Sequence, residues 1–184
     1  MRVISGKLRG RVLKGYNIEG TRPTMDRVKE SLFASIYDYI DEAIVLDLFA
    51  GSGNLGIEAI SNGASKCYFV DNNIECINVI KDNIRTFKIE NNSELIKADY
   101  KVAIKRLVSD NISFDIIFID PPYKYCIKEE LFKMLIENNL VSYGGIVVYE
   151  YSNKEEVEIS DNFKLLKSKR YGDKYIDIYR KVKS

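Results

Sequence analysis

Short apolar stretches alternate with longer amphipathic stretches from residue 44 to residue 151. The apolar stretches span residues 44–49, 66–70, 94–97, 114–119 and 145–151. The amphipathic stretches span residues 55–62, 74–87, 101–109 and 128–138. Buried parallel strands are nearly continuous apolar runs, whereas surface helices repeat apolar residues every three or four positions. The alternation therefore predicts an α/β fold in which helices cover both faces of a mostly parallel sheet.

Two further patterned segments flank this alternation. Residues 24–41 predict a helix, because apolar residues recur every fourth position from Val28 to Ile40 and Thr24 is a suitable N-cap. Residues 163–171 and 174–181 flank a Gly-Asp turn and predict an antiparallel hairpin, which brings the sheet to seven strands. Residues 1–16 mix β-branched residues with glycines, which predicts a short, poorly anchored hairpin or arm. We expect a basic N-terminal arm or hairpin at residues 1–20 and one domain at residues 21–184.

Composition limits the chemistry that this domain can perform. With 184 residues, 46% of them hydrophobic, the chain suits one well-buried domain. No apolar stretch approaches the ~20 residues of a membrane span and no secretory signal is recognisable, so a cytoplasmic protein without a membrane partner is expected. Histidine is absent, which excludes His-activated nucleophiles and His-based metal sites. The three cysteines lack metal-ligand spacing, so we predict reduced thiols and no metal.

Positive charge is concentrated at the N-terminus. Residues 1–15 contain five basic residues and no acidic residue, although the net charge of the whole chain is only +1. A basic arm on a mildly acidic body favours a polyanionic partner, but a solvated basic tail explains the charge equally well.

A glycine pattern follows the first apolar stretch. Gly51-x-Gly53-x-x-Gly56 permits a tight turn and a close approach of backbone to ligand. Asp71, twenty residues after Gly51, is placed to accept hydrogen bonds from ribose hydroxyls, and Asp99 is placed to accept one from an adenine amine. Asp47 suits the ammonium group of an amino acid and would repel a phosphate. S-adenosylmethionine is therefore favoured over a nicotinamide dinucleotide, although each of these aspartates could instead be a turn residue or a helix cap.

The sequence Asp120-Pro121-Pro122-Tyr123 closes the fourth apolar stretch. Two prolines make the chain leave the sheet in a stiff, extended form, at the edge where open α/β folds bind ligands. The Asp120 carboxylate and the Pro121 carbonyl can both accept hydrogen bonds from one NH₂ group, and Tyr123 can stack on a flat ring. The tetrapeptide suits a planar heterocycle with an exocyclic amine, although Pro-Pro also occurs in ordinary loops.

These motifs together resemble a known family. The sequence LDLFAGSG, an acid at the end of the second strand and DPPY resemble class I S-adenosylmethionine-dependent amino-methyltransferases. R-x-I-x-G-x-x-R-G-R-x-L at residues 2–13, RPTxDRVKExLF at residues 22–33 and the YGD turn at residues 171–173 narrow the resemblance to the RsmD family of bacterial 16S rRNA guanine-N2 methyltransferases. The resemblance covers nearly the whole chain; Lys29 stands where the family often has arginine. DPPY by itself is shared with DNA adenine and protein glutamine methyltransferases.

The resemblance implies a Rossmann-like methyltransferase that methylates N2 of a guanine in 16S rRNA, within a small-subunit assembly particle and as a monomer. A DNA adenine or protein glutamine methyltransferase is the alternative, and a non-enzymatic RNA-binding module is a third hypothesis. The expected catalytic residues are Asp120, Pro121, Pro122 and Tyr123. The expected cofactor residues are Asp47, Phe49, Gly51, Gly53, Asp71, Asn72, Asp99 and Tyr100. The expected RNA-binding residues are Arg2, Lys7, Arg9, Arg11, Arg22 and Arg27.

Overall fold

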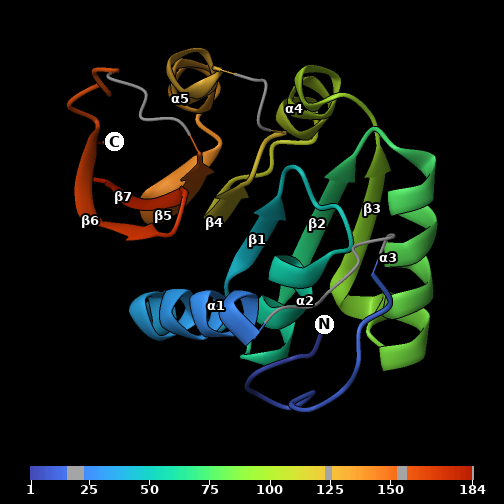
Figure 1. Ribbon diagram of the computed structural model, residues 1–184. Helices are drawn as coiled ribbons and strands as arrows, with labels where there is room; N and C mark the ends of the chain where they lie inside the picture. The colour runs from blue at the N-terminus through green and yellow to red at the C-terminus, as the bar shows by residue number, and fades with distance from the viewer. Residues whose placement is uncertain (16–22, 123–125, 153–156, 184) are drawn as a thin grey trace.

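A computed structural model describes residues 1–15, 23–122, 126–152 and 157–183. These residues form three layers, with a seven-stranded sheet between two layers of helices (Figure 1). The strand order is β3-β2-β1-β4-β5-β7-β6; β7 pairs antiparallel with β5 and β6, and the other pairs are parallel. The strands are β1 Ile44–Asp47, β2 Lys66–Asp71, β3 Ser93–Lys97, β4 Phe114–Ile119, β5 Val141–Tyr151, β6 Phe163–Tyr171 and β7 Lys174–Lys181. The predicted fold class is confirmed.

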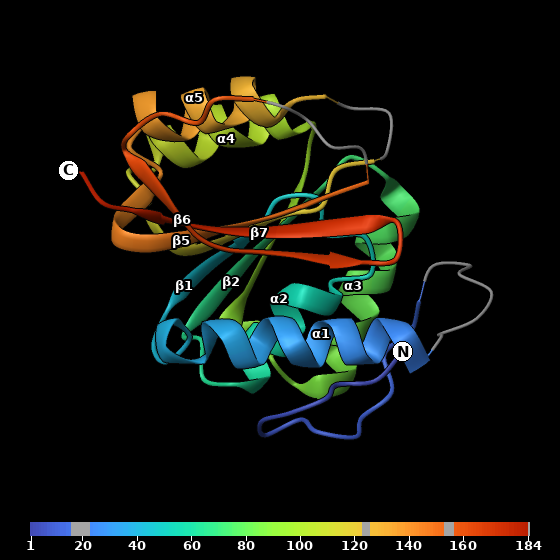
Figure 2. The ribbon, with the colours of Figure 1, turned by 60° about the vertical axis from the view of Figure 1, so that its left-hand side comes forward.

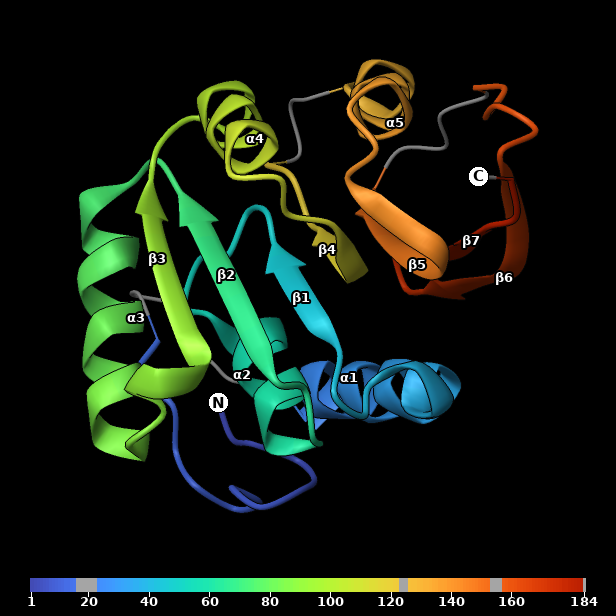
Figure 3. The same ribbon diagram turned by 180° about the vertical axis from the view of Figure 1, so that it is seen from behind.

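Helices cover both faces of the sheet (Figure 3). The helices are α1 Pro23–Ile36, α2 Asn54–Ser61, α3 Ile74–Phe87, α4 Tyr100–Ser109 and α5 Lys128–Glu137. Side chains of α1, α2 and α3 belong to one buried apolar cluster, and those of α4 and α5 belong to a second cluster across the sheet. Burial on both faces explains why the parallel strands are apolar throughout. Among the described residues, no helix is long and apolar enough to cross a membrane.

The predicted element boundaries differ from the structure mainly at turns. The first strand ends at Asp47, before the predicted residue 49, because the chain turns toward the glycine loop. Helix α1 begins at Pro23, so Thr24 is in its first turn and is not the N-cap; proline suits a first helical position because its missing N–H has no acceptor there. The helix ends at Ile36 and a 3₁₀ turn, Tyr37–Tyr39, replaces its predicted last turn.

The N-terminal segment is a hairpin fixed to the body, so the prediction of a poorly anchored arm is wrong. An antiparallel bridge joins Arg2 to Val12, and Val3, Leu8 and Leu13 are buried in the cluster of α1, α2 and α3. The sequence does not predict this anchoring, because the three apolar residues are irregularly spaced among glycines and basic residues. They are buried against helices that are distant along the chain.

A buried ion pair holds the hairpin against helices α1 and α2. The Lys29 ammonium lies 2.8 Å from the Glu58 carboxylate, and both side chains are almost fully buried. Lys29 also donates to the Arg2 carbonyl at 2.6 Å. Glu58 accepts hydrogen bonds from the backbone N–H groups of Ile4 and Ser5. The pair therefore connects α1, α2 and the hairpin in one polar network.

Candidate active site

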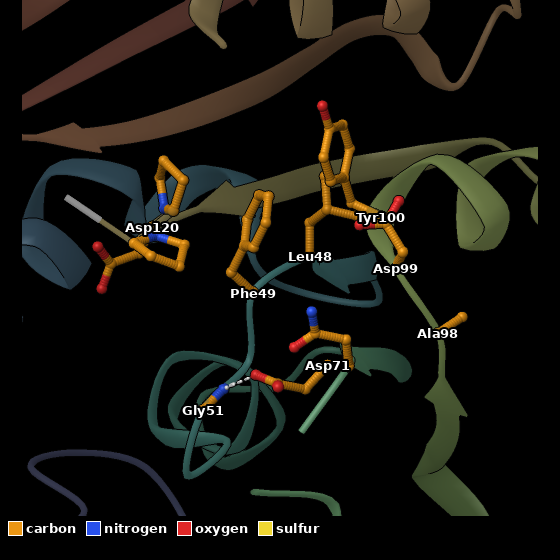
Figure 4. Close-up of a pocket in the computed structure, with 11 residues that line it drawn as sticks. Leu48, Phe49, Gly51, Asp71, Ala98, Asp99, Tyr100 and Asp120 are labelled. Atoms are coloured by element: carbon orange, nitrogen blue, oxygen red, sulfur yellow. Dashed lines mark hydrogen bonds between the residues drawn. The ribbon is translucent and has the colours of Figure 1, made fainter. Parts of the chain in front are cut away.

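One pocket, of about 340 Å³, lies at the carboxyl edge of the sheet, where β1, β2, β3 and β4 end (Figure 4). Figure 4 shows Phe49 between Asp120 on one side and Asp99 and Tyr100 on the other. The lining residues are Leu48, Phe49, Gly51, Asp71, Asn72, Ala98, Asp99, Tyr100, Asp120, Pro121 and Pro122. The pocket thus combines most of the residues proposed for cofactor binding with those proposed for the acceptor amine.

The loop between β1 and α2 forms the glycine turn. Gly51 and Gly53 have φ of 56° and 80°, values that side-chain-bearing residues rarely adopt. The Gly51 N–H donates to Asp71 Oδ2 at 2.9 Å, which ties the turn to the end of β2. A Cβ at Gly51 would meet open space, whereas a Cβ at Gly56 would lie 2.4 Å from the Phe69 ring. Glycine therefore lets a ligand approach at position 51 and lets α2 pack against β2 at position 56.

Two side chains after β3 complete this half of the pocket. Asp99 is exposed and caps α4, because its Oδ1 accepts the Lys101 N–H at 2.9 Å. Tyr100 packs against Phe49 with ring centroids 5.5 Å apart. Asp99 is therefore both a helix cap and a pocket residue, so the two hypotheses for it are compatible.

Asp120 on the other side of the pocket has an unusual electrostatic environment. Burial, and to a smaller extent the nearby Glu150 carboxylate, raise the pKa of the Asp120 carboxyl to about 8 against the opposing charge of Lys174. Glu150 and Lys174 form an ion pair. Within the described part of the chain, no hydrogen bond reaches the Asp120 carboxylate. A carboxyl group in such surroundings holds a proton near neutral pH until a cation or a hydrogen-bond donor arrives.

Asp47 and Gly53 do not line the pocket. Asp47 is buried beneath the glycine turn, where its Oδ2 accepts the Gly56 N–H at 3.0 Å. Burial raises the pKa of Asp47 to about 7, and the nearby Asp71 carboxylate also raises it. In this structure Asp47 orders the turn from the inside, and its predicted contact with a ligand's ammonium stays a prediction. Gly53 contributes its backbone conformation, as N-cap of α2.

The sequence did not single out Leu48, Ala98 or Glu150. Leu48 and Ala98 line the pocket, but an apolar residue near a strand end is indistinguishable from a core residue in the sequence. Glu150 lies near the end of a buried strand. An acidic residue within an apolar run is unusual, and this feature could have identified Glu150 from the sequence. Tyr123 and Arg22 lie outside the described residues, so their predicted roles stay predictions.

The predicted RNA-binding residues Arg2, Lys7, Arg9, Arg11 and Arg27 are all exposed. Arg27 is therefore not paired with an acid in the core; that place belongs to Lys29. The Lys7 N–H binds the carbonyl of Ser61, and the Arg11 guanidinium binds the carbonyl of Thr86. These carbonyls are at the C-terminal ends of α2 and α3, which lie at the sheet edge opposite the pocket. The tip of the hairpin thus faces away from the candidate site.

The charges of the pocket indicate which kind of ligand fits it. Asp71, Asp99 and Asp120 line it, Asp47 lies beneath it, and neighbouring carboxylates raise the pKa of both Asp47 and Asp120. Such an electronegative site attracts a cation and repels a pyrophosphate. The donor and acceptor groups present fit a ligand with a positive centre, vicinal hydroxyl groups and an amine, which are all parts of S-adenosylmethionine.

The strand order, the antiparallel β7 and the acid-lined carboxyl edge define a class I methyltransferase fold. The chain matches the family model "Conserved hypothetical protein 95" over residues 1–180. It is 35% identical, over 94% of its length and 89% of the relative's, to "Ribosomal RNA small subunit methyltransferase D" of Haemophilus influenzae. It is 37% identical, over 98% of its length and 99% of the relative's, to "Putative rRNA methyltransferase YlbH" of Bacillus subtilis.

A solved structure agrees with this assignment. The structure titled "Putative methyltransferase yhhF from Escherichia coli" superposes with a TM-score of 0.88 at 29% identity, and the alignment covers 100% of this chain and 99% of that one. The chain belongs to the family of ribosomal RNA small subunit methyltransferase D.

Proposed function

We propose that this protein transfers a methyl group from S-adenosylmethionine to the exocyclic N2 of a guanine in 16S rRNA. One observation carries the proposal: the strand-end acids Asp71 and Asp99 and the Asp120-Pro121-Pro122 segment line the same pocket. A cofactor and an acceptor amine bound there are neighbours, which converts a bimolecular reaction into an oriented one. The names of the relatives, which refer to rRNA of the small subunit, support the class of acceptor.

The side of the pocket formed by the ends of β1, β2 and β3, the cofactor half, binds S-adenosylmethionine through groups that are already ordered. Asp71 is held by the N–H groups of Gly51 and Asn73, and its remaining lone pairs can accept from the two ribose hydroxyls. Asp99 caps α4 through Oδ1, which leaves Oδ2, within the described part of the chain, to accept from the adenine amine. Phe49, beside the aromatic ring of Tyr100, offers an apolar surface to the adenine ring.

Asp120 and the Pro121 carbonyl act on the acceptor amine. Hydrogen bonds from N2–H to these oxygens favour a more sp³-like and more nucleophilic nitrogen. The cofactor, when bound, would supply the methyl group from its sulfonium: the S–CH₃ bond breaks as the N2–CH₃ bond forms, neutral S-adenosylhomocysteine leaves, and N2 releases one proton to solvent, so no histidine is needed. A sulfonium near Asp120 also lowers the pKa of its carboxyl from about 8, so cofactor binding favours the carboxylate form that accepts the hydrogen bond.

The experiment that tests the proposal is methyl transfer with defined acceptors. Purified protein and S-adenosylmethionine are incubated with naked 16S rRNA and with small subunits from a strain lacking the gene. Nuclease digestion and mass spectrometry then locate the modified nucleoside. We expect N2-methylguanosine at one position, and far slower formation with Asp120→Ala. Methylation of DNA adenine or of a protein glutamine with no change in rRNA would contradict the proposal.

A further inference from the structure

The edge strand β6 carries a basic surface that is not part of the pocket. β6 is the last strand of the sheet, and its residues from Lys164 to Arg170 are exposed. It carries no acidic residue between Phe163 and Tyr171. Its four basic residues are Lys164, Lys167, Lys169 and Arg170. A solvent-exposed edge with this charge matches the phosphates of a nucleic acid.

The strand registers place the basic end of β6 beside the candidate active site. Ile119, the residue before Asp120, pairs with Tyr149 of β5. The next residue of β5, Glu150, pairs with Ile176 of β7, which pairs with Lys169 of β6. Asp120 and Lys169 thus lie in line with each other along the direction of the inter-strand hydrogen bonds. Three strand spacings, or roughly 14 Å, separate them. This span corresponds to a few nucleotides, so a strand whose guanine reaches Asp120 can bring its flanking phosphates to β6.

Aromatic side chains and helix α1 extend the same surface. Tyr175 stacks on Tyr151 with ring centroids 5.2 Å apart, and the Arg170 guanidinium lies 5.6 Å above the Tyr175 ring. Lys169 and Tyr171 both bind the Ser31 hydroxyl of α1, which places the exposed face of α1 next to β6. Figure 2 shows the β6–β7 turn and the start of α1, which carries the exposed Arg27, on the same side of the molecule.

We propose that β6, from Lys164 to Arg170, together with Arg27 of α1, is the surface on which the RNA flanking the target guanine docks. This inference rests on the proposed function. Lysine on an edge strand also prevents strand pairing between molecules, so protection of the edge is the competing explanation. Protection of the edge does not explain why two of the four basic residues, Lys169 and Arg170, lie near the carboxyl end of β6. It also does not explain why the stacked tyrosines lie there.

The test compares three double variants that each remove two exposed positive charges. Lys169→Gln/Arg170→Gln changes the proposed surface. Lys105→Gln/Arg106→Gln changes an adjacent exposed pair of the same residue types on α4 and serves as the matched control. Lys7→Gln/Arg9→Gln changes the tip of the N-terminal hairpin, the alternative docking surface. Affinity for small subunits and for a 16S rRNA fragment is measured at several salt concentrations, along with S-adenosylhomocysteine binding, thermal unfolding and self-association.

We expect the β6 variant to bind RNA at least about tenfold more weakly at physiological salt. Its slope of log affinity against log salt should fall by about 1.4–1.8, because each lost phosphate contact removes roughly 0.7–0.9. S-adenosylhomocysteine binding should not change, and the α4 control should match the wild type. Unchanged RNA binding by the β6 variant, with or without new self-association, overturns the inference, as does a slope loss confined to the hairpin-tip variant. Either result leaves the proposed function intact, whereas failure of the wild type to methylate any RNA overturns both.

Discussion

The two halves of the pocket are made of similar residues but differ in how their acids are held. In the half formed by β1, β2 and β3, the Asp71 and Asp99 carboxylates accept hydrogen bonds from backbone N–H groups of turns and a helix start. In the half formed by the segment after β4, Asp120 lies near Glu150 of β5 and Lys174 of β7, and burial is the main reason that its pKa is raised to about 8. The first half is arranged before any ligand binds, whereas the charge state of the second depends on what enters.

The difference matches the two tasks that we assign to the halves. The amino-acid, ribose and adenine parts of the cofactor do not react, so they gain affinity from acceptors that are already positioned. An acid that accepts a hydrogen bond from the reacting amine must instead be in its carboxylate form, and a raised pKa lets the entering ligands determine that form. The N-terminal hairpin stabilises the first half, because Asn83 of α3 joins the Lys14 backbone to the Ser52 carbonyl in the glycine turn.

Removal of residues 1–15 should cause the largest loss of stability. The cofactor half of the pocket should be affected more than the other half. Three buried side chains, Val3, Leu8 and Leu13, would be lost, each worth about 1.5–3 kcal/mol, and Glu58 would lose its backbone donors. We expect no cooperative thermal transition in circular dichroism, or one strongly lowered in temperature. A truncated protein that melts like the full chain and still binds S-adenosylhomocysteine would show that the hairpin is an independent arm after all.

Lys29→Met should destabilise the protein by about 3–5 kcal/mol, because it leaves the Glu58 carboxylate buried without its cation. Denaturant unfolding measures the loss. Lys133→Met, which breaks an exposed pair with Glu137, is the control and should stay within about 0.5 kcal/mol of the wild type. A small loss for Lys29→Met would mean that the hydrogen bonds from the hairpin backbone satisfy Glu58 by themselves.

Lys128→Met is the corresponding variant for the acceptor half, because Lys128 is a buried lysine on that side of the sheet. It lies 2.9 Å from Asp177, close to the rings of Tyr149, Tyr151 and Tyr179, and it begins the helix that follows the Asp120-Pro121-Pro122 loop. We expect a stability loss similar to that of Lys29→Met, together with a lower kcat per folded molecule, since the loop loses its anchor. Equal kcat values in the two variants would show that the acceptor loop does not depend on this pair.

Asp71→Ala should weaken S-adenosylhomocysteine binding by about 1.5–3 kcal/mol, through loss of the hydrogen bonds to the ribose and of the acceptor for the Gly51 N–H. Isothermal titration calorimetry measures this loss directly. RNA affinity should change little, because the basic surface on β6 belongs to the other half of the sheet. Tight NADH binding by the wild type, without a response to S-adenosylhomocysteine, would contradict the assignment of the cofactor.

Asp120→Asn should stabilise the protein, an effect opposite in sign to those of Lys29→Met and Lys128→Met. The folded-state pKa of Asp120 is raised from 3.8 to about 8, so the folded protein holds the proton more tightly than the unfolded chain and stability falls as pH rises through this window. The amide has no charge to bury, so the gain should be absent below pH 4 and should grow with pH to several kcal/mol near pH 8, since each unit of pKa shift corresponds to about 1.4 kcal/mol. Thermal unfolding between pH 4 and 9 should show the gap widening with pH.

The same variant tests how Asp120 acts on the acceptor amine. Wild-type kcat/KM should rise with pH toward about 8, as the carboxyl of the free enzyme ionises. Asp120→Asn should keep substantial turnover without this rise, since an amide oxygen accepts the same hydrogen bond, whereas Asp120→Ala should be far slower. If asparagine is as inactive as alanine, the carboxylate is required as a charge or a base.

Local patterns in the sequence were enough to predict the order and type of the elements and most of the pocket. Strands β4, β6 and β7 and helix α3 have the predicted bounds, because apolar periodicity is a local property that burial on one or both faces imposes. The glycine turn and the acids after β2, β3 and β4 could be placed together from the sequence, since parallel strands end at one edge. Their arrangement around one pocket was therefore predictable for Asp71, Asp99 and Asp120, whereas the side chain of Asp47 turns inward to the Gly56 N–H.

The contacts between distant segments could not be predicted in this way and are known only from the packed chain. Tertiary packing placed the N-terminal hairpin over Glu58 and Lys29, and it put the tip of that hairpin at the edge opposite the pocket and basic β6 beside it. It also brought Glu150 close to Asp120, which together with burial determines the charge of that acid. Local sequence patterns carry no information on these pairings, because the free energy of burying a charge or an apolar side chain depends on partners that only the packed chain supplies.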